Sequence, residues 1–336
     1  MEYIKGKILT NHGFINGYLN ISSNKETQIS KGLPPEKPVA EGLIVPTFIN
    51  SHTHIGDSFI QDKNIKLTKS VIDLVAPPNG LKHKLLNEAS EEEIVSGMKK
   101  SIEGMIKTGT SCFCDFRENG IRGISLIQKA LKSKNINSIV LSRPKELKYN
   151  KNELDLLLKK SNGIGLSSIS DWDYSELGKI SKHTKRKSKL FSLHASEAFR
   201  EDIDLVLDLK PNFLIHMTNA TESDLERVKD ENIPIVICPR SSEFFNIKID
   251  LELMKKTKIE IMLGSDNCML NFPDILQDLK FIKGRSNVFS VEELLKMITY
   301  SPRKVLNLED CINGPNLSGN YVVLDRSSLD PIYISK

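Results

Sequence analysis

The sequence predicts an α/β protein whose larger part is a (β/α)8 TIM-type barrel. Eight short apolar segments alternate with longer amphipathic segments over about 250 residues, the usual length of such a barrel. The apolar segments are rich in Ile, Val and Leu without polar alternation, which is typical of a parallel sheet covered on both faces. No G-x-G-x-x-G sequence follows the first segment, which disfavours the alternative of an open doubly wound sheet.

The apolar and amphipathic segments give the expected elements of the barrel. The predicted strands are Leu43–Ser51, Thr110–Phe116, Ile136–Arg143, Gly163–Ile169, Leu190–Ala195, Phe213–Met217, Ile233–Pro239 and Ile259–Ser265. The predicted helices are Ser90–Lys107, Ile121–Ser133, Asn152–Lys160, Tyr174–Lys182, Glu197–Leu209, Thr221–Asp230, Leu251–Thr257, Pro273–Lys283, Val291–Thr299 and the short Pro302–Leu306. The first of these helices opens with Ser90 and Glu93 at the spacing of a capping box.

The two ends of the chain predict a small β subdomain. Strand-like pieces near the N-terminus, YIKGKILT and INGYLNIS, are separated by turn signals and end in the proline-rich connector GLPPEKP. The C-terminal piece SGNYVVL is again strand-like, so we expect both ends to pair. The predicted organisation is therefore a small β subdomain from residues 1–42 and 315–336, and a barrel from residues 43–314.

Composition and charge narrow the class of protein. At 336 residues, with 39% hydrophobic and 27% charged residues, the chain can bury a sizeable core. The net charge of +4 is small and the basic run His183–Lys189 is interpreted as a solvated helix end, so no nucleic-acid partner is expected. No segment reaches the roughly 20 apolar residues of a membrane span, and the N-terminus lacks a signal-peptide core. We therefore expect a cytoplasmic protein without a membrane partner.

The number and positions of the cysteines are also typical of a cytoplasmic protein. Their number, five, is odd, and most lie inside apolar segments, which is typical of reduced and buried thiols. Cys112 and Cys114 share an i, i+2 spacing, and we interpret them as buried strand thiols rather than metal ligands.

Polar side chains with the chemistry of metal ligands lie where four of the predicted strands end. His52 and His54 close the first strand with an i, i+2 spacing that sends both imidazoles to one face. His194, His216 and Asp266 close the fifth, sixth and eighth strands. Because catalytic groups of a barrel gather at the C-terminal ends of its strands, we expect these five side chains to converge on one site.

These motifs resemble the metal-dependent amidohydrolase superfamily. The resemblance rests on FINSHTHIGD, the H-x-x-E of His194 and Glu197, CPRSS at Cys238–Ser242, GSDN at Gly264–Asn267 and SPRKVLNL at Ser301–Leu308. Within the superfamily the chain is most similar to the mononuclear aminohydrolase branch, which includes cytosine, guanine and adenosine-type deaminases and chlorohydrolases. The predicted fourth strand, GIGLSSIS, offers no lysine to bridge two metals, which favours one metal ion.

The resemblance implies a reaction and a role for each residue. It implies that His52, His54, His194 and Asp266 are the metal ligands, that Glu197 is the proton shuttle and that His216 assists the attacking water. Three imidazoles and a carboxylate suit Zn²⁺ or, as a second choice, Fe²⁺, and the ion lowers the pKa of its water to about 7. The expected reaction is deamination of an amino-substituted heterocycle, such as a purine, pyrimidine or pteridine-like ring, by the resulting hydroxide.

The substrate itself is the least determined part of the prediction. Candidate contacts at other strand ends are Asp115, Arg117, Arg143, Trp172 and Arg240, and the arginines would suit an anionic substrate. Residues 58–89 are either a lid or an ordinary loop. Hydrolysis of a lactam, an imine or a C–Cl bond by the same chemistry stays open, as do a non-catalytic barrel scaffold and a homo-oligomer. The expected partner is a small-molecule substrate.

Overall fold

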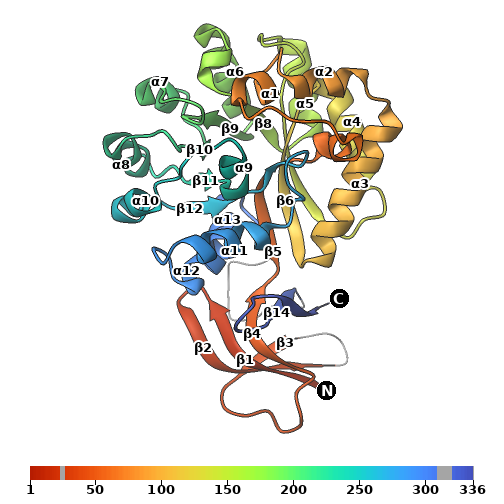
Figure 1. Ribbon diagram of the computed structural model, residues 1–336, viewed down its shortest axis with the longest axis vertical. Coiled ribbons are helices and arrows are strands. Elements are labelled where there is room, and N and C mark those ends of the chain that lie inside the picture. Colours follow the sequence, from red (N-terminus) through yellow and green to blue (C-terminus); the bar gives the residue numbers. More distant parts are fainter. Residues whose placement is uncertain (23–26, 309–319, 336) are drawn as a thin grey trace.

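The computed structural model describes residues 1–22, 27–308 and 320–335. It consists of a barrel of parallel strands surrounded by helices and a separate mixed sheet below it (Figure 1). This architecture confirms the predicted TIM-type barrel with a small β subdomain. The predicted boundary between residues 314 and 315 lies outside the described residues.

The barrel strands follow one another in chain order. In the described part of the chain nine parallel strands form one sheet in the order β12-β11-β10-β9-β8-β7-β6-β5-β13. Only Gly264 and Ser265 separate β12 from β13, so these two short segments together form the eighth strand, and β13 pairs with β5 to close the barrel. The bounds are β5 (Phe48–His54), β6 (Thr110–Arg117), β7 (Asn137–Ser142), β8 (Gly163–Leu166), β9 (Leu190–Ala195), β10 (Phe213–His216), β11 (Ile235–Ile237), β12 (Ile261–Leu263) and β13 (Asp266–Asn267).

The helices lie largely where the amphipathic segments predict them. Ser90 caps α3, where its side chain and that of Glu93 form the predicted capping box. The predicted helix Glu197–Leu209 is wrong in its first half, because only Ile203–Asp208 is helical and Asp202 caps it. The bounds are α3 (Glu91–Lys107), α4 (Gly120–Leu131), α5 (Lys151–Lys160), η2 (Ile169–Asp171), α6 (Tyr174–Arg186), α7 (Ile203–Asp208), α8 (Glu222–Asp230), α9 (Pro239–Phe244), α10 (Leu251–Thr257), α11 (Ile275–Arg285), α12 (Val291–Met297) and α13 (Tyr300–Val305).

The predicted first strand, Leu43–Ser51, is corrected to parts of two strands. β4 (Ala40–Pro46) belongs to the mixed sheet, and β5 begins at Phe48 in the barrel. The chain changes sheets at Thr47, whose carbonyl oxygen accepts a hydrogen bond of 2.8 Å from the Arg303 guanidinium. Since Leu43–Pro46 before Thr47 and Phe48 and Ile49 after it are apolar and buried, hydrophobicity could not reveal this break.

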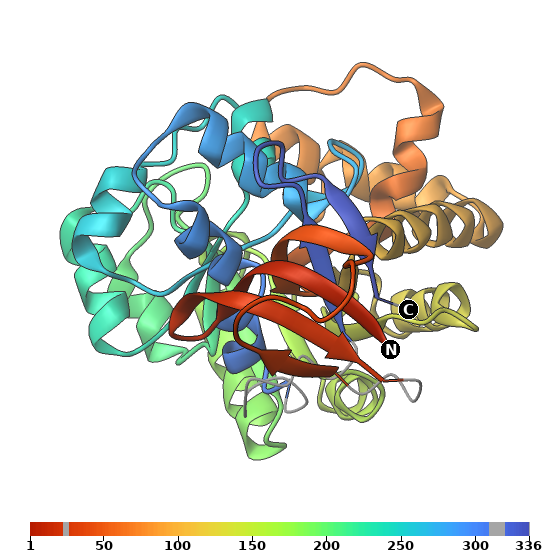
Figure 2. The same ribbon diagram turned by 90° about the horizontal axis from the view of Figure 1, so that it is seen from below.

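The mixed sheet joins the two ends of the chain. Its order in the described residues is β15-β14-β4-β1-β2-β3, so strands from both ends flank β4. Figure 2 shows this sheet from below, with both termini at the sheet rather than at the barrel. The bounds are β1 (Glu2–Thr10), β2 (Gly13–Ile21), β3 (Thr27–Ser30), β14 (Tyr321–Leu324) and β15 (Pro331–Ile334).

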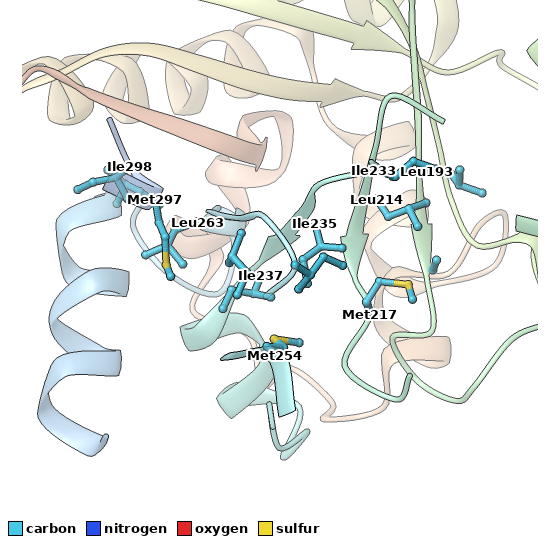
Figure 3. Close-up of a cluster of buried hydrophobic side chains, with 14 of the residues drawn as sticks. Leu193, Leu214, Met217, Ile233, Ile235, Ile237, Met254, Leu263, Met297 and Ile298 are labelled. Carbon is cyan, nitrogen blue, oxygen red and sulfur yellow. The ribbon is translucent and has the colours of Figure 1, made fainter. Parts of the chain in front are cut away.

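The barrel has an inner core and an outer core. Side chains such as Cys112, Cys114 and Ile215 fill the interior, and the two cysteines are buried there, as predicted. Alternate strand residues point outward and pack against the helices; Figure 3 shows this layer around Leu214, Ile235 and neighbouring side chains. Because both faces of each strand are buried, the strands carry the continuous apolar runs seen in the sequence.

The long connection after β5 contains three short helical elements. They are η1 (Ile55–Lys63), α1 (Val71–Val75) and α2 (Leu81–Glu88). Leu74 and Leu86 are buried in a satellite core with α3 and α4, which holds this connection against the barrel. Throughout the described residues, no helix combines the length and the apolar character that a membrane crossing requires.

Candidate active site

A cavity of about 640 Å³ opens at the C-terminal ends of the barrel strands. Its floor includes four of the side chains predicted to converge, namely His54, His194, His216 and Asp266, together with Glu197. Val71, Ile72, Val75, Ala76 and Pro77 from the connection after β5 form an apolar wall. Residues 58–89 therefore help to enclose the site.

The two histidines of β5 lie side by side. Their ring centroids are 4.8 Å apart, and both rings are almost completely shielded from solvent. His54 Nδ1 lies 2.8 Å from Glu118 Oε1. Because a carboxylate can only accept, His54 donates from Nδ1 and keeps a lone pair on Nε2. That lone pair faces the centre of the cluster.

His194 has the same arrangement. Its Nδ1–H donates to the carbonyl oxygen of Leu166 at 2.8 Å, so Nε2 carries the lone pair. His194 Nε2 lies 3.4 Å from His54 Nε2. In a metal-bound histidine, one ring nitrogen usually donates a hydrogen bond to a protein acceptor, and the other binds the metal through its lone pair.

Asp266 completes the cluster at the start of β13. Its Oδ1 lies 3.3 Å from His52 Nε2 and 3.6 Å from His54 Nε2. Ser241 donates a hydrogen bond to the other oxygen, Oδ2, and Asn267 donates to Oδ1 at 2.9 Å. Burial alone would raise the pKa of Asp266, but the adjacent rings of His52 and the other histidines hold it well below its usual range. The carboxylate is therefore ionised.

The donor set fits a divalent cation. One ligand atom each from His52, His194, His216 and Asp266 lies within 4.8 Å of the others. Both ring nitrogens of His52 are buried and lack a hydrogen-bond partner, a costly arrangement that a bound cation would relieve. Burial lowers the pKa of His54 to about 3 and that of His194 well below its usual value. Neutral imidazoles with one carboxylate are the ligands that Zn²⁺ prefers.

Among the five convergent residues, His216 is the one that faces Glu197. Its Nε2 faces Glu197 Oε2 at 3.5 Å, and its Nδ1 is buried without a hydrogen-bond partner in the described residues. It thus lacks the hydrogen-bond acceptor that orients His54 and His194, and His52 lacks one as well. His216 lies within reach of the same centre, so the ligand set of His52, His54, His194 and Asp266 stays a prediction.

Glu197 is a buried carboxyl group beside His216. Burial, and next the negative charge of Asp266, raises its pKa well above the usual value. Burial lowers the pKa of the neighbouring His216 to about 4. A protonated carboxyl beside a neutral imidazole can donate a proton near neutral pH, which is the role predicted for Glu197.

The backbone around these groups is unusual. His216 and Asp266 have φ angles of +74° and +62°, in the left-handed region that residues other than glycine rarely adopt. Gly264 precedes Asp266 by two residues, and a Cβ atom there would approach His52 Cβ to 2.7 Å. Glycine at position 264 is therefore required by the close packing of the eighth strand against the first.

A charged cluster that the sequence analysis did not assemble supports His54. Lys82, from α2, lies 2.6 Å from Glu118 Oε1 and 3.5 Å from Asp57 Oδ2, and donates to Asn267 at 2.8 Å. Glu118 also pairs with Arg117. Burial would raise the pKa of Glu118, but Lys82, His54 and Arg117 hold it well below its usual range.

Two predicted substrate contacts belong to the same buried cluster. Asp115 accepts hydrogen bonds from Thr53 and from the backbone of Ile55, and Arg117 pairs with Asp115 at 3.2 Å. Neither residue lines the cavity. Cys112, Cys114 and Phe116 of β6 point into the barrel, so Asp115 and Arg117, at the alternate positions, face the other side.

Of the other three predicted substrate contacts, one lines the cavity and two do not. Arg143 lines the cavity, as expected. Trp172 does not; its indole donates to Ser167 at 3.0 Å and its ring packs in the outer core. Arg240 also lies outside the lining and pairs with Asp278 at 2.7 Å. These two positions therefore have structural partners instead of a place at the cavity.

Several lining residues were missed by the sequence analysis. Lys82 and the apolar wall come from the connection after β5, where the only signal was the segment PPNGLKHK at residues 77–84. Phe199 follows Glu197 in a stretch predicted as helix. Ser167, Ser168 and Ser170 follow β8, and their short hydroxyl side chains carry no distinctive spacing.

Comparison with known proteins supports the relation suggested by the motifs. A model of the amidohydrolase family matches residues 43–312. An uncharacterized protein of Methanocaldococcus jannaschii is 37% identical over 325 residues, which covers 91% of this chain and 82% of that protein.

Solved structures share the fold at low sequence identity. The 5-methylcytosine deaminase from Klebsiella pneumoniae, solved with 5-fluorocytosine, has a TM-score of 0.75 at 13% identity and covers 99% of this chain and 98% of its own. An adenosine deaminase from Xanthomonas campestris, solved with bound zinc, has a TM-score of 0.75 at 14% identity and covers 97% and 85%. At such identities the likeness concerns the fold.

Proposed function

Because the chain belongs to the amidohydrolase family, we propose that it hydrolytically deaminates an amino-substituted heterocycle, a purine, pyrimidine or pteridine-like ring. The observation that carries this proposal is the pair of Glu197 and His216, 3.5 Å apart, beside a buried cluster of histidines and one aspartate in the same cavity. A protonated carboxyl next to a site for water activation is what the hydrolysis of a cyclic amidine needs.

His52, His54, His194 and Asp266 would hold one divalent ion, Zn²⁺ in first place and Fe²⁺ in second. When bound, this ion supplies Lewis-acid activation of a water molecule. The residues of the chain account for the remaining roles. Glu118 and the Leu166 carbonyl fix the orientation of the His54 and His194 rings.

The proton path follows from the positions of three side chains. Glu197, protonated because of its raised pKa, donates to a ring nitrogen of the substrate and makes the adjacent amino-bearing carbon electrophilic. Asp266, an ionised carboxylate, accepts a proton from the attacking water. His216 donates a hydrogen bond to the oxygen that becomes negatively charged. Glu197 then takes a proton from the newly added hydroxyl group and passes it to the amino group, which leaves as ammonia. The proton held by Asp266 finally returns to Glu197 and restores both groups.

An ammonia-release screen tests the proposal. Metal-free protein is reloaded with Zn²⁺ or Fe²⁺ and incubated with amino-substituted purines, pyrimidines and pteridines. We expect ammonia from at least one ring class, and the Glu197→Gln variant should release it roughly 10²- to 10⁴-fold more slowly. The exposed Glu226→Gln variant serves as the matched control and should keep full activity.

Two results would contradict the proposal. One is full activity in the Glu197→Gln variant. The other is hydrolysis of lactams, imines or C–Cl bonds by the loaded protein without ammonia release from any amino-substituted ring. A protein that binds no metal and hydrolyses none of these compounds would instead be a barrel scaffold.

A further inference from the structure

Arg143 lies at the cavity, one residue beyond the end of β7. Its backbone N–H donates to the carbonyl oxygen of Arg117 at 2.9 Å, which continues the pairing between β7 and β6 and fixes its position. Its side chain lines the same cavity as Glu197, His216 and Asp266. A ligand in the cavity can therefore contact Arg143 and the proposed catalytic groups together.

The guanidinium of Arg143 lacks a partner. Among the described residues, no hydrogen bond or ion pair joins it to another side chain or to a carbonyl oxygen. The other arginines shielded from solvent have such partners: Arg117 pairs with Asp115 and Glu118, Arg240 with Asp278, and Arg303 with carbonyl oxygens of Thr47 and Thr299. Arg186 also lacks a partner, but it is exposed to water at the end of α6.

Neighbouring carboxylates do not neutralise Arg143. Glu118 is committed to Lys82, Arg117 and the His54 ring. Asp171 also lines the cavity and attracts Arg143, but the two side chains form no ion pair. Burial lowers the pKa of Arg143, which shows that the charged form is incompletely compensated. A half-buried guanidinium that lines a cavity and has no protein partner is available to a ligand.

We propose that Arg143 binds an anionic substituent, a carboxylate or a phosphate, on the heterocycle that the site deaminates. The identity of the ring rests on the proposed function, whereas the recognition of the anion rests on Arg143 alone. The planar guanidinium presents paired N–H donors that match the two oxygens of such a group. Lys82, the other basic residue of the lining, already has three internal partners and is not available for this contact.

The cavity suits a ligand with a ring and a charged arm. Its lining combines charged and polar side chains with an apolar wall. The apolar wall of Val71, Ile72 and Val75 can cover the faces of a flat ring, while Arg143 receives the polar end. Exclusion of water by this wall strengthens the contact between the guanidinium and an anion.

Binding to an inactivated protein tests this proposal without turnover. Zinc-loaded Glu197→Gln protein is titrated in a calorimeter with three matched pairs: 5-carboxycytosine and 5-methylcytosine, pterin-6-carboxylate and 6-methylpterin, and adenosine 5′-monophosphate and adenosine. We expect the anionic member of at least one pair to bind roughly 10- to 100-fold more tightly than the neutral member. Adding Arg143→Gln should abolish this preference, and adding Arg186→Gln should leave it unchanged.

Each remaining outcome overturns the assignment. These outcomes are neutral members that bind as tightly as the anionic ones, a failure of every anionic member to bind, and a preference that survives Arg143→Gln. Because the readout needs no ammonia release, a failure of deamination in the screen above and a failure of anion recognition here are separate results. Tighter binding of the carboxylates than of the phosphate, or the reverse, identifies which anionic group Arg143 binds.

Discussion

The two sides of the active site differ in how their polar groups are satisfied. On the side built by β5, β6 and α2, His54, Glu118 and Lys82 form a chain of contacts of 2.8 and 2.6 Å. On the side built by β9 and β10, Glu197 and His216 meet only at 3.5 Å, and one His216 nitrogen has no partner. In the proposed mechanism the first side would orient a metal-binding histidine, whereas the second would exchange protons with the substrate. The predictions below test this division, in order of their expected effect on stability.

The largest effect is expected for Glu118→Ala. The substitution leaves Lys82 and Arg117 as buried charges without this partner, which typically costs 3–5 kcal/mol, and it removes the acceptor of the His54 ring. We therefore expect a large fall in the free energy of unfolding, measured with urea. Zinc affinity, measured by competition with a chelator, should fall roughly 10- to 100-fold.

The Glu118→Gln variant is the matched control for that experiment. It keeps an acceptor for the His54 N–H but removes the negative charge. We expect it to retain more zinc affinity than Glu118→Ala while losing much of the stability. Equal zinc affinity in the wild type and both variants would show that Glu118 has no role in orienting His54.

An intermediate and pH-dependent effect is expected for Asp57→Asn. Burial, opposed by Lys82, raises the pKa of Asp57 to about 7 in the folded protein, from 3.8 in the unfolded chain. Between these values the folded protein keeps a proton that the unfolded chain has lost, so stability falls as pH rises through this window and levels off above it. The variant cannot titrate there, so its stability relative to wild type should rise by roughly 3 kcal/mol between pH 5 and pH 8.

Urea denaturation of both proteins at pH 5, 6, 7 and 8 measures this difference. If the difference in the free energy of unfolding between the variant and the wild type stays constant from pH 5 to pH 8, Asp57 is already ionised at pH 5. In that case the positive charge of Lys82 would fully offset the cost of burying the Asp57 carboxylate.

The smallest effect on stability is expected for His216→Asn, on the reactive side. Asparagine tolerates the left-handed backbone at this position, and the substitution removes a buried nitrogen that has no partner. The free energy of unfolding should change by no more than about 1 kcal/mol, while ammonia release should fall roughly 10²- to 10³-fold. A loss of stability as large as that of Glu118→Ala would erase the distinction between the two sides.

The sequence alone predicts the parts of the molecule that local patterns determine. Alternating apolar and amphipathic segments give the barrel, and side chains at strand ends give His52, His54, His194, His216 and Asp266, because the fold brings equivalent strand ends together. The break at Thr47 was missed, since the apolar run continues across it while the chain passes from one sheet to another.

The supporting groups could not be predicted in the same way. Lys82 meets Glu118 across 36 residues, and no periodicity connects an element of a long connection with the end of β6. The direction of Asp115 and Arg117, by contrast, follows from strand alternation, because Cys114 and Phe116 face the barrel interior. Attention to this alternation would have removed both residues from the predicted substrate contacts.

The central claim is that side chains from the first, fifth and eighth strands hold a single divalent ion. The direct measurement is the zinc content per chain, by atomic emission, after metal-free protein is reloaded and dialysed. We predict one ion per wild-type chain and none in a His52→Ala/Asp266→Ala double variant that remains folded by circular dichroism. A wild-type chain that retains no zinc, or a double variant that still retains one ion, would contradict the account.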